Sequence, residues 1–320
     1  MPVSTTFISR TNATPLIPEE VSKTILENAI QESAVLPLFT KLPNMSSRTL
    51  RMPVLDTLAT AYFVEGTGVV DPDNPPGLKR TSAISWANKY IYAEEIAVII
   101  PIPEDVLEDS EFDVWEGAMP SIRQALGATI DSAIIFAGTK PNLWPDAIMT
   151  AVAAKAQTVV DGTNVDLYGD ISAAMALPEA DGFDIDNAIT YVGMKARMRD
   201  LRTANGEPLL TTDLTQATGN MVAGIPLTYI KNGAWNSAVA KMILGNFKAC
   251  VYSMRQDMRV KILTEATIYD TDGTTILYQL AQRDMVALRI TMRMGWQFPN
   301  PVNAIQTTAA SRYPFAAIIP

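Results

Sequence analysis

Histidine is absent from this chain of 320 residues, and cysteine occurs once, at position 250. The lack of imidazole excludes the common hydrolase triads and His-based metal sites, and a single thiol excludes an intrachain disulfide framework. Cys250 is flanked by Ala249 and Val251 in an apolar run, so we expect a small buried residue rather than a nucleophile. Its free thiol suits a reducing compartment.

Long apolar runs and clusters of basic residues are missing as well. No window reaches the roughly 18 uninterrupted apolar residues of a membrane span, and no basic start followed by an apolar stretch opens the sequence. We therefore expect neither export nor membrane insertion. The net charge of -9, from 34 acidic and 25 basic residues, disfavours direct nucleic-acid recognition but allows an acidic wall that encloses nucleic acid.

Motifs for catalysis are scarce. The sequence has no phosphate loop and no G-x-S-x-G turn, and the run from Gly66 to Asp71 lacks the third glycine of a dinucleotide fingerprint. Neighbouring carboxylates could serve a glycosidase or hold a cation, and they lie at Glu94 and Glu95, Glu104 and Asp105, Glu108 and Asp109, and Asp184 and Asp186. Glu94 and Glu95 would face opposite sides of a strand. Asp270 to Gly273 is more typical of a turn than of a calcium loop.

The composition, 48% hydrophobic and 18% charged, is that of a folded chain with a sizeable core. The first 45 residues contain one amphipathic helix signal, in which Pro18 precedes Val21, Ile25 and Ala29 at four-residue spacing. Frequent prolines around this helix predict an arm that needs a surface to lie on.

Two long runs with period-two apolar patterns follow, over residues 50–64 and 82–101, and the second carries Trp86 and Tyr90 on one parity. Between them the segment 66–79 holds six Gly or Pro residues, which predicts an extended hairpin with a mobile tip. A two-stranded ribbon is marginal in water, so we expect it to pack against another chain, or else to fold back on its own domain.

Helical periodicity dominates residues 111–138, with Asp113 available as N-cap and Gly138 as the stop. Pro120 lies inside this segment, so we expect either a kink there or two helices meeting end to end. The middle third alternates short helical and strand patterns, and strand patterns dominate from residue 249 onward.

Several strings, taken in this order along the chain, resemble the major capsid proteins of tailed bacteriophages, which have the Hong-Kong-97-type fold. They are Val64 to Gly66, Pro103 to Ser110, Asp131 to Gly138, Leu201 to Leu209, Gly224 to Pro226, Leu244 to Phe247, and Met292 to Ile305. Two positions depart from the family pattern, because Pro103 stands where serine is frequent and Asn246 where aspartate is usual. The family's N-terminal scaffolding extension has no counterpart here, so either a separate scaffolding protein assists assembly or none is required.

The resemblance implies an α+β fold with four parts. These are an N-terminal arm (1–45), an extended β-hairpin loop (46–95), a peripheral domain with a long spine helix (96–150 and 256–320), and an α/β axial domain (151–255). It also implies a structural, non-enzymatic role without cofactor or metal. Many copies would associate as hexamers and pentamers into an icosahedral head shell of the virion, assembled in the host cytoplasm.

The implied partners are further copies of the chain, a portal, and a possible scaffolding or decoration protein. The shell would enclose double-stranded DNA without reading its sequence, and no membrane is involved. The residues that we expect to contact neighbouring subunits lie on the arm and the hairpin: Val21, Ile25, Tyr62, Val64, Glu65, Gly66, Lys79, Arg80, Trp86 and Tyr90.

Some members of the family join their chains covalently through a lysine of the extended loop and an asparagine near the last strands. Lys79 or Lys89 with Asn300 or Asn303 are the corresponding candidates, although such residues are ordinary on hairpins and in turns. Two other functions stay open. One is an encapsulin-type bacterial compartment shell, distinguished by its cargo, and the more remote one is a soluble carboxylate-dependent enzyme.

Overall fold

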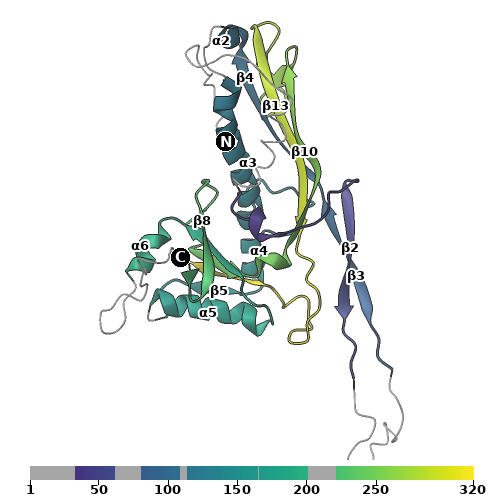
Figure 1. The fold of residues 1–320 in the computed structure, drawn as a ribbon, viewed down its shortest axis with the longest axis vertical. Coiled ribbons are helices and arrows are strands. Elements are labelled where there is room, and N and C mark those ends of the chain that lie inside the picture. The colour runs from purple at the N-terminus through teal and green to yellow at the C-terminus, as the bar shows by residue number, and fades with distance from the viewer. Residues whose placement is uncertain (1–32, 62–80, 109–113, 165, 201–220) are drawn as a thin grey trace, which may run out of the picture.

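The computed structural model describes residues 33–61, 81–108, 114–164, 166–200 and 221–320 of the chain. These residues form two main sheets with helices packed on them, and a two-stranded ribbon extends away from the body (Figure 1). No helix in the described ranges is both long enough and apolar enough to span a membrane.

The first main sheet has four strands in the order β1-β10-β13-β4. Their bounds are β1, Thr40–Lys41; β10, Val251–Leu263; β13, Met285–Gln297; and β4, Glu94–Pro103. β13 pairs antiparallel with both β10 and β4, whereas the short β1 pairs parallel with β10. The long strands lie alongside helix α3, Val114–Phe136, and the short helix α2, Glu104–Glu108, follows β4 at the far end (Figure 1).

Helix α3 presents one apolar stripe to this sheet, because its buried residues recur at three- and four-residue intervals. Ile122 and Leu126 pack in one cluster with Ile290 of β13. The helix continues through Pro120, which is exposed, so the alternative of two helices meeting end to end is wrong. The predicted N-cap, Asp113, lies outside the described residues.

The C-terminal end of α3 differs from the expectation, which placed the helix-terminating residue at Gly138. α3 ends at Phe136, and Ala137 rather than Gly138 adopts the left-handed conformation, with φ 61°. Gly138 donates its N–H to the carbonyl of Ser132, and a Cβ at position 138 would lie 2.2 Å from the Ser132 hydroxyl. Glycine at 138 thus leaves room for the Ser132 hydroxyl, and its backbone angles do not demand it.

The second main sheet has six strands in the order β5-β14-β9-β6-β8-β7. Their bounds are β5, Thr158–Val160; β14, Phe315–Ile319; β9, Met242–Gly245; β6, Asn187–Tyr191; β8, Ile225–Ile230; and β7, Met221–Val222. Its helices are α4, Ile148–Ala154; α5, Leu167–Ala180; and α6, Met194–Arg199. The strands and helices expected in the middle third are thus present.

The hydrogen bonding crosses the expected domain boundaries at two places. β14 lies between β5 and β9, so residues 315–319 belong to the six-stranded sheet and not to the sheet of residues 256–297. The last residues of the expected arm, 33–45, are also part of the body. They include the 3-10 turn Leu36–Leu38 and β1, and Val35, Leu36 and Phe39 are buried in the main core.

A continuous row of aromatic rings joins the two sheets. Successive ring centroids are 4.9 to 6.5 Å apart along the series Phe183, Phe298, Tyr313, Phe315, Phe247, Phe39 and Trp296. Phe315 belongs to the six-stranded sheet and Trp296 to the four-stranded sheet. Cys250 lies in the same core with no exposed surface, which confirms its expected role as a buried residue.

Two hairpins complete the described fold. β2, Thr49–Thr57, and β3, Ser85–Tyr92, form the extended ribbon. The expected long run 82–101 is divided at Ala93 into β3 and β4, which belong to different sheets. The second hairpin, β11 (Thr267–Tyr269) with β12 (Ile276–Gln279), surrounds the Asp270 to Gly273 segment, where the sequence predicts a turn.

Candidate functional site

The ribbon of β2 and β3 has two faces of different character. Residues directly paired across antiparallel strands share a face. Leu50 pairs with Ile91, and their side packs with Met45 near the body. Leu55 pairs with Trp86, on the opposite side. The two period-two sets found in the sequence therefore point to opposite faces of one ribbon.

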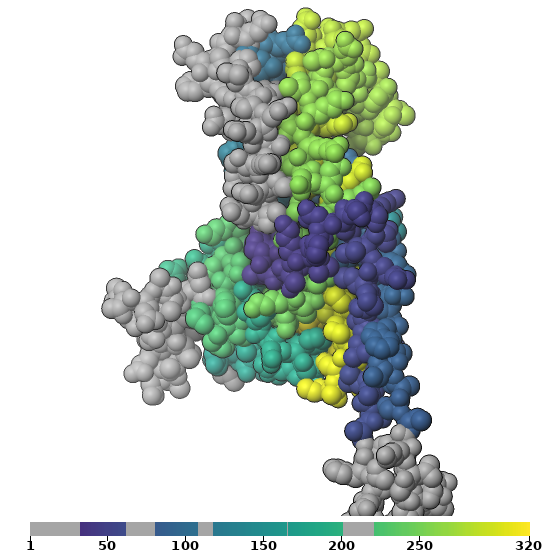
Figure 2. Space-filling model, turned by 45° about the vertical axis from the view of Figure 1, so that its right-hand side comes forward, coloured from purple at the N-terminus to yellow at the C-terminus, as the bar shows by residue number. Residues whose placement is uncertain are grey.

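The second face of the ribbon is exposed and aromatic. The exposed fraction is 66% for Trp86, 49% for Ile84 and 39% for Tyr90, and the rings of Tyr90 and Tyr92 are 6.3 Å apart. The ribbon leaves the body and ends below it (Figure 2). The same face also carries Arg51 and Asn88, both exposed. Exposed aromatic side chains on a ribbon that cannot form its own core are typical of an interaction site.

The base of the ribbon is held rigidly by the body. The indole N–H of Trp144 donates to the carbonyl of Tyr92 over 3.2 Å, and the side-chain amide of Gln297 donates to the carbonyl of Tyr90 over 3.0 Å. At Gly295 a Cβ would lie 2.2 Å from the carbonyl oxygen of Tyr92. Only glycine allows β13 and the ribbon to approach so closely.

The root of the arm is held by a buried carboxylate on the spine helix. Asp131 has no exposed surface and accepts hydrogen bonds from the Ser33 hydroxyl, the backbone N–H of Ala34 and of Val35, and the Asn232 side chain. Burial raises the pKa of this carboxyl above its usual range, and the four donors act in the opposite direction. Three segments about 100 residues apart thus meet at one side chain.

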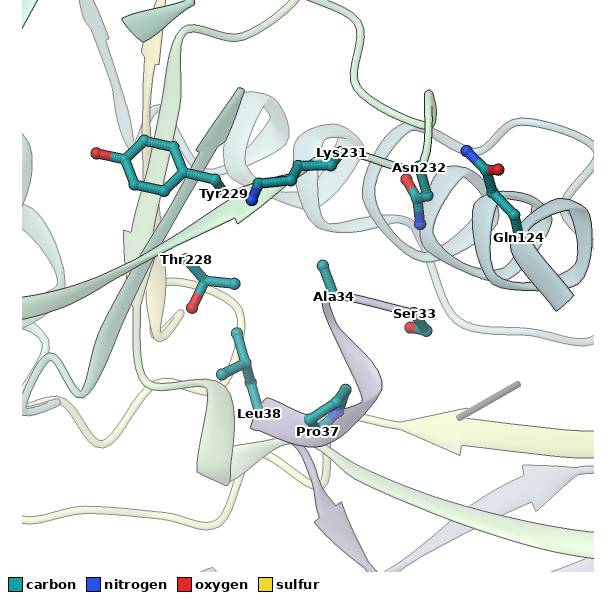
Figure 3. A pocket seen from close by; sticks show the side chains of 9 residues that line it. All are labelled: Ser33, Ala34, Pro37, Leu38, Gln124, Thr228, Tyr229, Lys231 and Asn232. Carbon is teal, nitrogen blue, oxygen red and sulfur yellow. The ribbon is translucent and has the colours of Figure 1, made fainter. Parts of the chain in front are cut away.

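A pocket of about 590 Å3 lies beside this junction (Figure 3). The root of the arm forms one wall, Gln124 of α3 another, and β8 with the residues after it a third. Lys231 and Asn232 line the last wall, and the Asn232 amide is already bonded to Asp131. The lining residues include no acid, and the Ser33 hydroxyl among them donates to Asp131, so we assign the pocket no chemistry.

The candidate carboxylates Glu94, Glu95 and Asp186 each have separate partners, and Asp109 lies outside the described residues. Glu94 pairs with Arg48 over 2.9 Å, whereas the next residue, Glu95, pairs with Arg293. Asp186 accepts the backbone N–H groups of Phe247 and Lys248, which is a structural capping role. In the part of the chain that the structure describes, no three Asp, Glu or Cys residues are grouped to hold a metal ion.

The other acidic candidate is a turn, as the sequence indicates. The Asp272 carboxylate accepts the N–H groups of Thr274 and Thr275, and these bonds, with the Thr275 hydroxyl, hold its pKa below the usual range. The segment closes the β11–β12 hairpin.

Of the ten expected contact residues, the structure describes Trp86 and Tyr90, and both are exposed. The others lie outside the described residues: Val21, Ile25, Tyr62, Val64, Glu65, Gly66, Lys79 and Arg80. Sequence reasoning missed Asp131 and Gly295. The available signal for Asp131 was an acid within the apolar stripe of a helix, next to Ile130.

The two asparagines considered for a covalent link already have partners within the chain. The Asn300 side chain accepts from Arg312 and donates to the carbonyl of Ala309. The Asn303 amide donates to the carbonyl of Asp181 and accepts the N–H of Gln306. Neither side chain is free to approach a lysine without breaking these bonds, so crosslinking stays a prediction with weak support.

Comparison with known proteins gives a consistent result. The family model described as "Phage capsid family" matches residues 13–308. The major capsid protein of Staphylococcus phage 80alpha is 25% identical over 220 residues, which cover 68% of this chain and 64% of that protein. The chain thus matches slightly less than two thirds of that relative's length.

Solved structures agree with the sequence comparisons. A chain from Microbacterium phage Oxtober96 is 36% identical, with a TM-score of 0.76 over 90% of this chain and 91% of that one. A chain from Mycobacterium phage Adephagia is 29% identical, with a TM-score of 0.75 over 90% of each. These likenesses confirm the expected α+β capsid fold. The chain therefore belongs to the phage capsid family, whose members are structural capsid proteins and not enzymes.

Proposed function

We propose that this chain is a major capsid protein that assembles, as hexamers and pentamers, into the icosahedral head of a tailed phage. The observation that carries the proposal is the exposed aromatic face of the ribbon, with Trp86 two-thirds exposed. In a shell this face would be covered by a neighbouring copy. Large aromatic side chains bury 150–250 Å2 each, at roughly 25 cal/mol per Å2, so even two rings give a useful contact.

Each subunit of a closed shell makes several such contacts. Individually modest interfaces then hold a stable particle, because binding at one interface raises the effective concentration at the next. We propose the same role for the arm residues Val21 and Ile25 and for the tip of the hairpin, whose positions are not described.

The proposed division of the subunit follows the expectation, with one modification. The spine helix and four-stranded sheet form the peripheral domain, and the six-stranded sheet forms the axial domain. We assign residues 315–319 to the axial domain because β14 is one of its inner strands. Residues 33–45 are the root of the arm and are fixed to the body.

The remaining partners are proposed on chemical grounds. A chain with net charge -9 would enclose double-stranded DNA without adhering to it. The virion is the proposed location, with assembly in the host cytoplasm, a portal at one vertex, and a scaffolding or decoration protein where the shell requires one.

The test is electron microscopy and light scattering of the purified chain, alone and with the co-expressed scaffolding candidate. We expect uniform closed shells from the wild type. Trp86→Ala removes the largest ring of the aromatic face and should abolish or strongly reduce shells, whereas Ser85→Ala, an exposed change on the same strand but the other face, should not.

Two outcomes would contradict the proposal. A monomer or small oligomer under every condition would remove the shell function itself. Shells that contain a packaged enzyme in place of genome-length DNA would favour the encapsulin-type alternative.

A further inference from the structure

We propose that the loop of residues 298–314 is a strut that fixes the direction of the ribbon relative to the six-stranded sheet, and that Arg312 is the positioning residue at its centre. For its effect on shells this inference rests on the proposed function. For its effect on the isolated subunit it does not.

Arg312 holds the loop in one shape. Its side chain is almost completely buried and donates to four acceptors, which are the Asn300 side-chain oxygen (2.7 Å), the Asn300 carbonyl (3.0 Å), the Gln306 carbonyl (2.7 Å) and the Thr307 carbonyl (3.1 Å). All four belong to the loop itself. The planar guanidinium can satisfy several acceptors at fixed angles, which no other side chain can do.

One end of the strut is attached to the six-stranded sheet through Asp181, directly after α5. The Asp181 carboxylate accepts the N–H of Tyr313 over 3.0 Å, and its backbone carbonyl accepts the Asn303 side chain over 2.7 Å. Lys155, directly after α4, also donates to the carbonyl of Ala310. The loop is therefore anchored beside this sheet at three of its residues, Asn303, Ala310 and Tyr313.

The other end is attached to the ribbon. The N–H of Val302 donates to the carbonyl of Leu55 over 3.0 Å, and Val302 is buried. This contact lies on β2 at the position where the β2–β3 register shifts, between Leu55 and Thr57. Figure 2 shows the yellow loop between the green and teal sheet and the purple and blue ribbon.

The charges support the same arrangement. Among the described residues no carboxylate is hydrogen bonded to the guanidinium, and Asp56 of the ribbon and Asp181 at the end of α5 act on it electrostatically. Burial lowers the pKa of Arg312 from its ordinary value, and these acids partly compensate. The Arg312 cation is thus attracted both toward the ribbon and toward the end of α5.

The consequence is mechanical. The ribbon is fixed to the body at Tyr90, by Gln297 of β13, and at Tyr92, by Trp144. The contact at Leu55, farther along the ribbon, adds a second point that restricts its angle. A strand advances about 3.3 Å per residue, so a small rotation at the base becomes a large displacement at the tip. If the angle between the ribbon and the rest of the subunit varied, the aromatic face would meet the next subunit at a varying position.

The first experiment measures the ribbon angle in the unassembled, full-length subunit. Spin labels on cysteines placed at Lys89 and Tyr168 report the distance between ribbon and α5, and both sites are exposed while native Cys250 is buried. We expect one narrow distance distribution for the wild type and one at least about twice as wide for Arg312→Gln. Arg312→Lys should narrow the distance distribution only slightly, because an ammonium group cannot reproduce the planar set of N–H donors of a guanidinium.

The matched control is Arg197→Gln, which removes an arginine of α6 that is paired with Asp161 and lies outside the strut. It should leave the distribution unchanged. Should Arg312→Gln fail to fold, Asn300→Ala removes one acceptor and keeps the buried cation, and it should widen the distribution less. An unchanged distribution in a folded Arg312→Gln or Asn300→Ala subunit would overturn the inference.

The second experiment examines particles. Arg312→Gln subunits should assemble into shells of mixed size, where wild-type shells are uniform. If wild-type protein forms no shells, the proposed function fails while the distance measurement still tests the strut. If both proteins form identical shells and identical distributions, the strut alone is refuted.

Discussion

The hydroxyl of Ser33 donates a hydrogen bond to the Asp131 carboxylate over 2.5 Å, across 98 positions of the sequence. The adjacent backbone N–H groups of Ala34 and Val35 bind the same carboxylate, and Asn232 completes the set. The arm therefore leaves the body from a fixed point on the spine helix of its own chain.

Replacing Asp131 by asparagine should loosen this junction. An asparagine amide would place an N–H toward donors that now face a carboxylate oxygen, leaving buried groups unpaired. We expect a loss of about 1–3 kcal/mol in the free energy of unfolding. Urea unfolding measures it, with Gln124→Ala on the exposed side of the same helix as control. Equal stability of both variants would show that the junction is not energetically important.

The same variant should have a distinct pH dependence. Because the folded-state pKa of Asp131 is raised, the folded state binds its proton more tightly than the unfolded state, and stability falls as pH rises from about 4 through the folded pKa. Asparagine does not titrate. The stability difference between wild type and Asp131→Asn should thus be larger at pH 4 than at pH 7. A difference that grows with pH would contradict the raised pKa.

Gly295→Ala should disturb the base of the ribbon. The added Cβ would lie 2.2 Å from the Tyr92 carbonyl and 2.7 Å from a methyl group of Ile91, so β13 and the ribbon must separate. We expect a loss of about 1–3 kcal/mol or more and faster hydrogen exchange in β3. Gly273→Ala is the control, since nothing lies within 4 Å there and only its positive φ of 69° opposes the change. Equal effects at both positions would argue against the close approach.

Phe247→Ala should weaken the joint between the two sheets. Phe247 is fully buried and contacts the rings of Phe39 and Phe315, with centroids 6.5 and 4.9 Å away. A loss of about 3–5 kcal/mol is expected from the cavity and the missing contacts. Denaturant unfolding monitored by far-ultraviolet circular dichroism checks it, and a loss below about 1 kcal/mol would mean that the core closes around the gap.

The Cys250 thiol should not react with thiol reagents in the native state. It has no exposed surface, and burial, with a contribution from Asp186, raises its pKa well above the ordinary value. Ellman's reagent should react only as the protein unfolds, at a rate that increases with denaturant. Rapid labelling without denaturant would contradict the described packing.

The sequence patterns predicted local elements well. The hairpin around Asp270, the helix ending near residue 136 and the buried Cys250 all follow from local turn, period and burial preferences. Pairings between distant segments could not be predicted, because period-two patterns state which residues face inward and not which strand lies alongside. The insertion of β14 between β5 and β9, and the division of one long run at Ala93, are of this kind.

The site divides in the same way. Trp86 and Tyr90 were predicted as contact residues because a ribbon has little core of its own, and both are exposed, while their contact with a neighbour stays a prediction. Gly295 depends on Tyr92, 203 positions away, and Arg312 on acceptors spread over a loop, so no local pattern indicates their roles. For Asp131 the pattern indicates a buried acid but not its partners Ser33 and Asn232. Of the two expectations for Pro120, two helices meeting end to end is wrong, because the helix continues through this residue, and a kink there stays a prediction.

The position of β14 also sets the order of events during synthesis. Residues 315–319 are hydrogen bonded on both sides, parallel to β5 and antiparallel to β9, and four of the five are completely or almost completely buried. The six-stranded sheet cannot close until residue 319 has emerged from the ribosome. From the synthesis of β9, which ends at residue 245, until that of β14, the nascent chain therefore carries β5 and β9 with an unfilled position between them.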